Sequence, residues 1–467
     1  MRSLGLAQAA VYGLIALYHG WRVPTTASWI DDAVAWATAI ALFLLYRSGY
    51  RQVSQSDPAV PLRQIVLYAC PLVLISAVTV PFDSSDAFLY LAMARAQAQY
   101  GLNPYTDLMR TIVPDITLDP AIGAQWMSGN YNPWLDLPLV YGFFFANLLR
   151  LVGWAANGSW WIALLLIKLV NVAAYALTAG ILWACTRHLG EDRHPGRTLY
   201  LFMWSPLVLI HEIANGHNDL LMGCLIAAAF YLILTGRLVW SVPVLVAAAM
   251  VKYLAILFVP MTLFVILRKR GVLQAVGSAL AGVGVFVLLG FPYLGEFSRF
   301  QLQLIVAQMN KFTAGTLTGV LFYTYRSLDR NFSLFSGTLE PVGTALQIAM
   351  TILALSFLAG LTYWFFRSDL STENMLWAWT AMLFVIMFLS PQFYAWYFGM
   401  LFPIALLLRG SDPLRELIVI LSATHLASLP SIGSKALNYF ILGTVTGLLW
   451  WGLKKNFIPP PRSAVPK

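Results

Sequence analysis

Four short polar clusters interrupt an otherwise apolar chain, and their side chains are of the types that bind polar substrates and move protons. An ionisable side chain near the centre of a bilayer costs at least about 2.5–3.5 kcal/mol, so one kept near that depth marks a candidate site. If the clusters meet at one membrane face, they bring together carboxylates, an imidazole, an ammonium and aromatic rings. The clusters are Asp83-Ser84-Ser85-Asp86, His217-Asn218-Asp219, Lys252-Tyr253 and the stretch from Gln392 through Tyr397.

The carboxylates of Asp83 and Asp86 directly follow an apolar run, and two roles are open to them. Either can stabilise the start of the helix predicted to begin near Ser85. Alternatively, a carboxylate at the boundary of water and lipid can accept a proton from an incoming hydroxyl or bind a cation. We favour Asp86 as the general base, because Tyr90 and Ala94 follow it at helical spacing. Asp83 is the second candidate.

The segment 205–222, SPLVLIHEIANGHNDLLM, places a group of polar side chains between two apolar runs, and five of them are candidates for the site. A lone histidine is more often a core residue, but a polar turn at a helix start can bind an anion through backbone N–H groups or orient a hydroxyl. The spacing of His217 and Asp219 is not that of a zinc site. No cofactor is predicted, and the sequence does not decide whether a divalent metal takes part. The five residues are His211, Glu212, His217, Asn218 and Asp219.

Lys252 is the single cation within the apolar stretch 238–267. Its side chain can extend to the lipid headgroups, or its ammonium can pair with a phosphate as a point charge. The aromatic stretch that follows Gln392 is equally open to two interpretations. It suits an interfacial aromatic belt, and its rings and amide suit a sugar.

Composition indicates the elements that must position these clusters. The chain is 59% apolar and 10% charged, whereas globular domains are about 45–50% apolar and about 25% charged. Apolar runs of about 17–28 residues recur, each long enough to cross the roughly 30 Å hydrocarbon layer as a helix. We therefore predict an all-α, polytopic transmembrane protein with roughly a dozen crossings. The net charge of +9 lies in short clusters between these runs, which indicates topology signals and not a nucleic-acid partner.

Short basic loops remain cytoplasmic, and this rule orients the chain. Runs near 4–20, 27–46 and 64–80 precede residues 81–133, which are too polar to span a membrane. We predict that residues 81–133 form an extracytoplasmic catalytic loop with short amphipathic helices.

Later segments complete this topology. Residues 238–267 lie between clusters of cations and are predicted to form a helical hairpin with Lys252 at its outer tip. The run 134–152 is expected to be re-entrant or interfacial, and the Pro-rich tail 453–467 to be cytoplasmic. We expect a single multi-pass domain over residues 1–467 in the plasma membrane, with its polar clusters facing outward.

Taken together, these motifs resemble the GT-C superfamily of integral-membrane glycosyltransferases. The chain is most similar to bacterial α-mannosyltransferases that use polyprenol-phosphate-mannose, over about residues 64–410. The features that carry the resemblance are Asp86 with Tyr90, Gly101-Leu102-Asn103-Pro104-Tyr105, the segment 205–222, Val251-Lys252-Tyr253 and the stretch from Ser390 through Tyr397.

The resemblance implies an inverting transfer of a hexose, with mannose favoured, from a polyprenyl-phosphate-sugar to a hydroxyl of a lipid-linked or glycan acceptor. Asp86 is then the catalytic carboxylate with Asp83 as its substitute, and Lys252 and His217 bind the donor phosphate. The remaining candidates for substrate binding are Tyr90, Asn103, Tyr105, His211, Glu212, Asn218, Asp219, Tyr253, Gln392, Tyr394, Trp396 and Tyr397.

A transporter or flippase of a lipid-linked sugar is the alternative, because broken helices and midplane charges also occur there. The two halves of the chain show no self-similarity that would support it. The sequence does not decide the sugar, the acceptor, the linkage or the oligomeric state.

Overall fold

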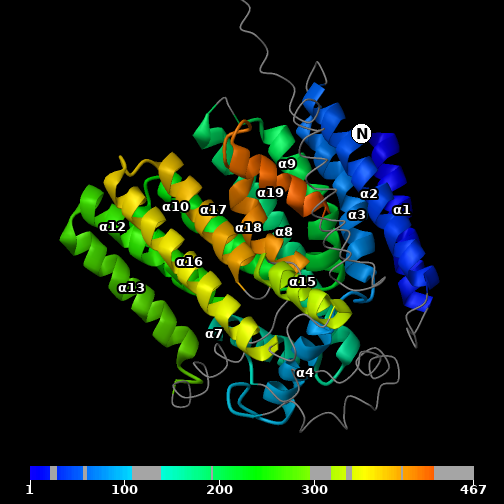
Figure 1. The fold of residues 1–467 in the computed structure, drawn as a ribbon, viewed down its shortest axis with the longest axis horizontal. Helices are drawn as coiled ribbons and strands as arrows, with labels where there is room; N and C mark the ends of the chain where they lie inside the picture. Colours follow the sequence, from blue (N-terminus) through cyan, green and yellow to red (C-terminus); the bar gives the residue numbers. More distant parts are fainter. Residues whose placement is uncertain are drawn as a thin grey trace, which may run out of the picture.

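The computed structural model describes residues 1–21, 29–55, 60–107, 138–190, 193–294, 317–332, 339–390 and 393–424, and every regular element among them is a helix. A chain in lipid must satisfy its backbone polar groups internally, which a helix does. Figure 1 shows the helices gathered in one bundle. The prediction of an all-helical chain is confirmed for these residues.

Within the described residues, five helices are long and apolar enough to cross a membrane, and a bent pair would make six. Four more apolar helices have only 10–17 residues. This is fewer than the roughly dozen expected crossings, because several apolar runs are divided into short helices. The apolar run at 198–214, for example, is divided between α9 (Pro195–Met203) and a π-helical turn, η3 (Val208–Ala214). A further apolar run, near 433–452, lies outside the described residues.

The N-terminal helices α1 (Arg2–Trp21), α2 (Trp29–Gln55) and α3 (Leu62–Val78) pack together along one side of the bundle (Figure 1). Buried hydrogen bonds join them to α9. The Tyr46 hydroxyl donates to the Leu201 carbonyl at 2.6 Å, and the Trp204 indole donates to the Ile65 carbonyl at 3.0 Å. These bonds satisfy polar atoms that the bilayer could not.

The centre of the bundle is formed by α8 (Trp160–Leu189), α10 (Asp219–Leu234), α11 (Leu238–Ala249) and α18 (Phe398–Ala405). A side chain at Gly223 would lie 2.4 Å from the backbone of α18, so glycine is required for this close approach.

On the far side, the chain runs through α12 (Phe258–Arg270), α13 (Val272–Gly290), α16 (Leu339–Arg367) and α17 (Thr372–Leu389). Only 11% of the apolar window of α13 and 6% of that of α16 are buried. Those two helices therefore present their apolar faces outward, as lipid-facing helices do.

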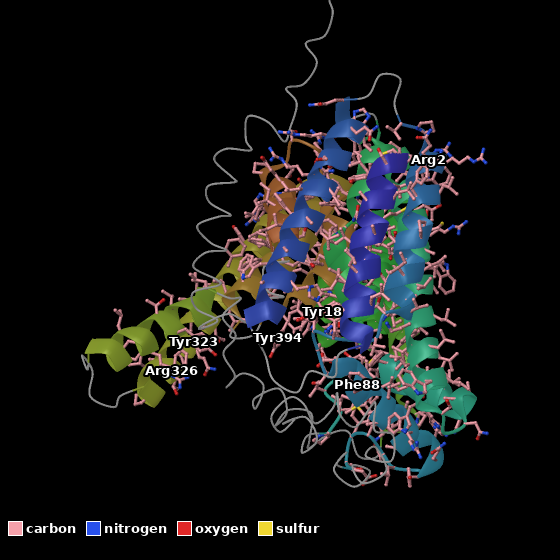
Figure 2. The ribbon with its side chains drawn as sticks, turned by 90° about the vertical axis from the view of Figure 1, so that its right-hand side faces the viewer. Arg2, Tyr18, Phe88, Tyr323, Arg326 and Tyr394 are labelled. Carbon is pink, nitrogen blue, oxygen red and sulfur yellow. The ribbon has the colours of Figure 1, made fainter. Side chains whose placement is uncertain are left out.

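The two ends of the bundle differ. The short helices α4 (Asp86–Gln99) and α7 (Phe143–Ala156) lie at one end, and the α12–α13 and α16–α17 connections lie at the other (Figure 1). Figure 2 places Arg2 at one end and Tyr394 and Phe88 toward the opposite end, with α15 (Leu317–Phe332) projecting to one side. The end that carries α4 holds the candidate site.

Candidate active site

The carboxylates lie on the short connection between α3 and α4. Ser85 is the N-cap residue of α4, and the Ser84 hydroxyl accepts a hydrogen bond from the Asp86 amide at 3.1 Å. Neither Asp83 nor Asp86 is therefore the N-cap residue, whereas Asp86 lies in the first turn of α4, where a carboxylate favours the helix start. Their side chains are 19% and 16% exposed, respectively.

A π-helical turn positions the histidines opposite these carboxylates. In η3 the Asn215 amide donates to the Ile210 carbonyl at 2.8 Å, five residues earlier. Gly216 then takes φ +76°, a left-handed conformation that glycine adopts without strain. The chain bends by 110° between η3 and α10. π-Helical turns of this kind occur frequently at functional sites.

Two histidine–aspartate pairs result from this bend. Nδ1 of His211 lies 3.2 Å from Oδ2 of Asp83, and Nδ1 of His217 lies 3.5 Å from Oδ2 of Asp86. Asn215 fixes the carboxylate segment to the turn, since its Oδ1 accepts hydrogen bonds from the amides of Phe82 and Asp83 at 2.7 and 2.9 Å. The two segments therefore form one unit although some 130 residues separate them.

Lys252 enters the site from the break between α11 and η4 (Tyr253–Leu257). Its Nζ donates to Oδ1 of Asp219 at 2.6 Å and lies 4.7 Å from the ring centre of Tyr397. The break is held against the start of α7, where the Gly142 amide donates to the Val251 carbonyl at 3.2 Å. The sequence left open that the Lys252 side chain extends to the lipid headgroups. In the structure it pairs with Asp219 instead.

The environment of Asp86 favours its charged form. Burial alone would raise the pKa of this carboxyl, but the hydrogen bond and charge of His217, the Lys252 ammonium and the Ser84 hydroxyl outweigh burial. Together they hold the pKa of Asp86 below its usual value. The group is therefore ionised at neutral pH and able to accept a proton.

Two rings stack on the indole of Trp396, which belongs to the 3-10 turn η5 (Ala395–Tyr397). The His217 imidazole lies 4.0 Å from it with an interplanar angle of 10°, and the Tyr394 ring lies 4.5 Å from it at 4°. An interfacial belt does not explain these contacts, because they orient a histidine of the site. Gln392 lies outside the described residues.

Three of the predicted tyrosines gather around Tyr141. The hydroxyls of Tyr90 and Tyr141 lie 3.0 Å apart, and the hydroxyls of Tyr105 and Tyr253 donate to the Tyr141 carbonyl at 3.0 and 3.2 Å. Asn103 in turn accepts from the Tyr105 amide at 3.0 Å. The group adjoins the charged residues, because Nζ of Lys252 lies 5.5 Å from the ring centre of Tyr141. Tyr90 and Tyr105 are fully buried.

Several buried polar atoms of segment 205–222 have no hydrogen-bond partner among the described residues. Native proteins leave few such atoms, because each costs its full desolvation penalty. Atoms of this kind, next to an ionised carboxylate and an ammonium, suit a ligand rich in hydroxyl or phosphate oxygens. No cluster of three or more metal-binding side chains is found in the described part of the chain. The unpartnered atoms are Nε2 of His211 and His217, Oε1 of Glu212, both amide atoms of Asn218 and Oδ2 of Asp219.

Sequence reasoning missed two residues of this site, Asn215 and Tyr141. Asn215 lies inside the segment that the sequence singled out, so its polarity was a usable signal. Tyr141 stands in an apolar aromatic run, and no pattern in the sequence distinguishes it.

Comparison with known proteins gives two kinds of match. Residues 5–268, more than half of the chain, match the model of a protein family described as alpha-(1->6)-mannopyranosyltransferase, N-terminal domain. The chain is 27% identical over 361 residues to alpha-(1->6)-mannopyranosyltransferase A of Mycobacterium tuberculosis, covering 73% of this chain and 64% of that protein. It is 22% identical over 268 residues to the protein of the same name from Corynebacterium glutamicum, covering 56% and 50%. The matches thus span between half and two thirds of these relatives.

Proposed function

The chain belongs to the family of the alpha-(1->6)-mannopyranosyltransferases, and from this premise we propose that it is a membrane mannosyltransferase. Its donor is a polyprenyl-phosphate-mannose, and its acceptor is a hydroxyl of a lipid-linked glycan or another glycan. The linkage that its relatives' names state, alpha-(1->6), is the one we propose for the product.

In the proposed reaction the acceptor hydroxyl attacks the anomeric carbon of mannose. The new bond joins the acceptor oxygen to that carbon, and the bond from that carbon to the phosphate oxygen breaks with inversion. The polyprenyl phosphate leaves with the electron pair, and the hydroxyl proton passes to the Asp86 carboxylate. Lys252 and His217 stabilise the negative charge of the leaving phosphate.

One observation carries this proposal: the ionised Asp86, the Lys252–Asp219 pair and the unpartnered polar atoms of segment 205–222 meet in one place. All of them lie within the residues that match the family. A hydroxyl acceptor and a phosphate leaving group require an acid–base group next to a cation and next to polar atoms that lack a hydrogen-bond partner.

The distribution of basic residues supports an extracytoplasmic site. The end opposite α4 carries α9 and the α12–α13 and α16–α17 connections (Figure 1). Arg197 of α9 donates to the Ser54 carbonyl, and Lys269 of α12 donates to the Leu370 carbonyl, each at 2.8 Å. Short basic loops stay in the cytoplasm, so the α4 end faces outward.

Asp86→Asn in a reconstituted assay with polyprenyl-phosphate-mannose tests the proposal. Asparagine keeps the size of the side chain and removes its basicity, so transfer should fall by about 10²–10⁴-fold. Asp83→Asn should have a smaller effect. The matched control is Asp369→Asn, which makes the same change in the exposed α16–α17 connection. Equal activity of Asp86→Asn and the wild-type protein would refute the general base.

A further inference from the structure

Lys168 is a buried cation that the proposed reaction does not use. It lies on α8 in the run Leu164-Leu165-Leu166-Ile167-Lys168-Leu169-Val170, and it is only 3% exposed. At 1.5 Å per residue it stands roughly 12 Å along the helix from Trp160. No carboxylate of the described residues forms an ion pair with it. A charge at such a position is expensive, so a specific contact must account for it.

The ammonium of Lys168 meets four backbone carbonyls. Nζ donates to the carbonyl of Ala214 at 2.6 Å and to that of Thr79, and it lies 3.5 Å from the carbonyls of Ser76 and Ile213. The three N–H groups of the Lys168 ammonium are thus shared among four carbonyl acceptors.

These carbonyls belong to the ends of two helices. Ser76 and Thr79 lie at the C-terminus of α3, and Ile213 and Ala214 end η3. The last carbonyls of a helix lack intrahelical partners and carry partial negative charge. A cation held between two such ends satisfies both and draws them together.

The two chain segments that leave these ends carry the proposed chemistry. After α3 the chain reaches Asp83 and Asp86, and after η3 it reaches His217. Three residues further along α8, Asn171 donates to the Glu212 carbonyl at 2.9 Å and so fixes η3 a second time.

We propose that Lys168 is a positioning residue whose ammonium clamps the C-terminal ends of α3 and η3 together and thereby sets the separation of Asp86 from His217. The importance of that separation for transfer rests on the proposed function. The clamp itself is a property of the fold and is measurable without catalysis.

Lys168→Met tests the clamp, with Arg193→Met as its matched control. Arg193 is also a buried cation that donates to carbonyls, those of Leu407 at 2.6 Å and Leu189 at 3.2 Å. It differs from Lys168 in that it also pairs with Glu373 at 2.6 Å, and it precedes α9 and lies away from the α4 end. Lys168→Met should lower kcat by about tenfold to a hundredfold through misplacement of the base, with the donor KM within about twofold. Arg193→Met should keep the wild-type kcat and KM.

Hydrogen–deuterium exchange supplies a readout that does not depend on activity. In Lys168→Met, exchange should rise in residues 79–86 and 213–219 together, whereas in Arg193→Met it should rise only near residues 189, 373 and 407. Lys168→Gln, which keeps two N–H donors without the charge, should lie between wild type and Lys168→Met, and it replaces the methionine variant if that one does not fold.

Unchanged exchange in both segments of Lys168→Met would overturn the clamp, and an unchanged kcat would overturn its role in positioning Asp86. Wild-type activity of Asp86→Asn would instead refute Asp86 as the general base of the proposed reaction and leave the exchange result standing.

Discussion

Replacing Lys252 by alanine separates a binding role from a structural one. The Lys252 ammonium lies 2.6 Å from a carboxylate oxygen of Asp219, whose side chain is fully buried, while that of Lys252 is 13% exposed. The substitution therefore removes the candidate ligand of the donor phosphate and the counter-ion of a buried carboxylate at once.

The two effects have different sizes and different readouts. Removing one partner of a buried ion pair costs about 3–5 kcal/mol of stability. A charge-assisted hydrogen bond to the donor phosphate contributes about 1.5–3 kcal/mol, which corresponds to a roughly 10- to 150-fold rise in the donor KM. Because the contact exists before the reaction begins, KM should rise more than kcat falls.

The assay combines donor kinetics with thermal unfolding in three variants. Lys252→Ala should lose both stability and donor affinity, and Lys252→Arg should keep part of each. In Lys252→Ala/Asp219→Asn the unpaired charge is gone, so stability should recover partly while donor affinity stays low. A Lys252→Ala protein that is less stable but binds the donor as the wild type does would refute the phosphate contact, and the pair would then be structural only.

Further expectations concern the groups around Asp86. His217 contributes to keeping the pKa of Asp86 below its usual value, so His217→Ala should raise that pKa and move the acid limb of the kcat/KM profile to higher pH; an unmoved limb would contradict the contact. Trp396→Ala removes the ring on which His217 stacks, and because such a pair contributes about 0.5–1.5 kcal/mol, kcat should fall roughly two- to tenfold, with Trp396→Phe less affected. Single cysteines at positions 86 and 216 of a cysteine-free protein should react with an impermeant reagent from outside, and a cysteine at position 268 should not; reaction of position 216 only from the cytoplasm would separate the histidines from Asp86.

The sequence identified the charged members of the site because charges are rare and costly within apolar runs. Asp86, His217 and Lys252 were each recognisable for this reason, and the structure places them together. The same reasoning applied to Lys168, another cation in an apolar run, would have singled it out. The role of each residue stays a prediction.

The contacts that the charged residues of the site make could not be predicted from the sequence. Lys252 and Asp219 are 33 positions apart, and only the packing of α10 against α11 brings them within 2.6 Å. The pattern of apolar runs predicted the long helices, because length and hydropathy determine those. It did not predict the π-helical turn, since the choice between two backbone registers depends on tertiary contacts such as that of Asn215 with the carboxylate segment.

The π-helical turn also makes segment 205–222 sensitive to its length. Removing one residue between 208 and 214 would restore an ordinary α-helical register and rotate the following chain by about 100° relative to His211. His211 and His217 would then no longer both face the aspartates that they meet now. An exchange of one apolar side chain for another in η3 leaves this geometry intact, whereas a change of one residue in length does not. The single extra residue in the turn therefore acts as a spacer that keeps two histidines aligned with two carboxylates.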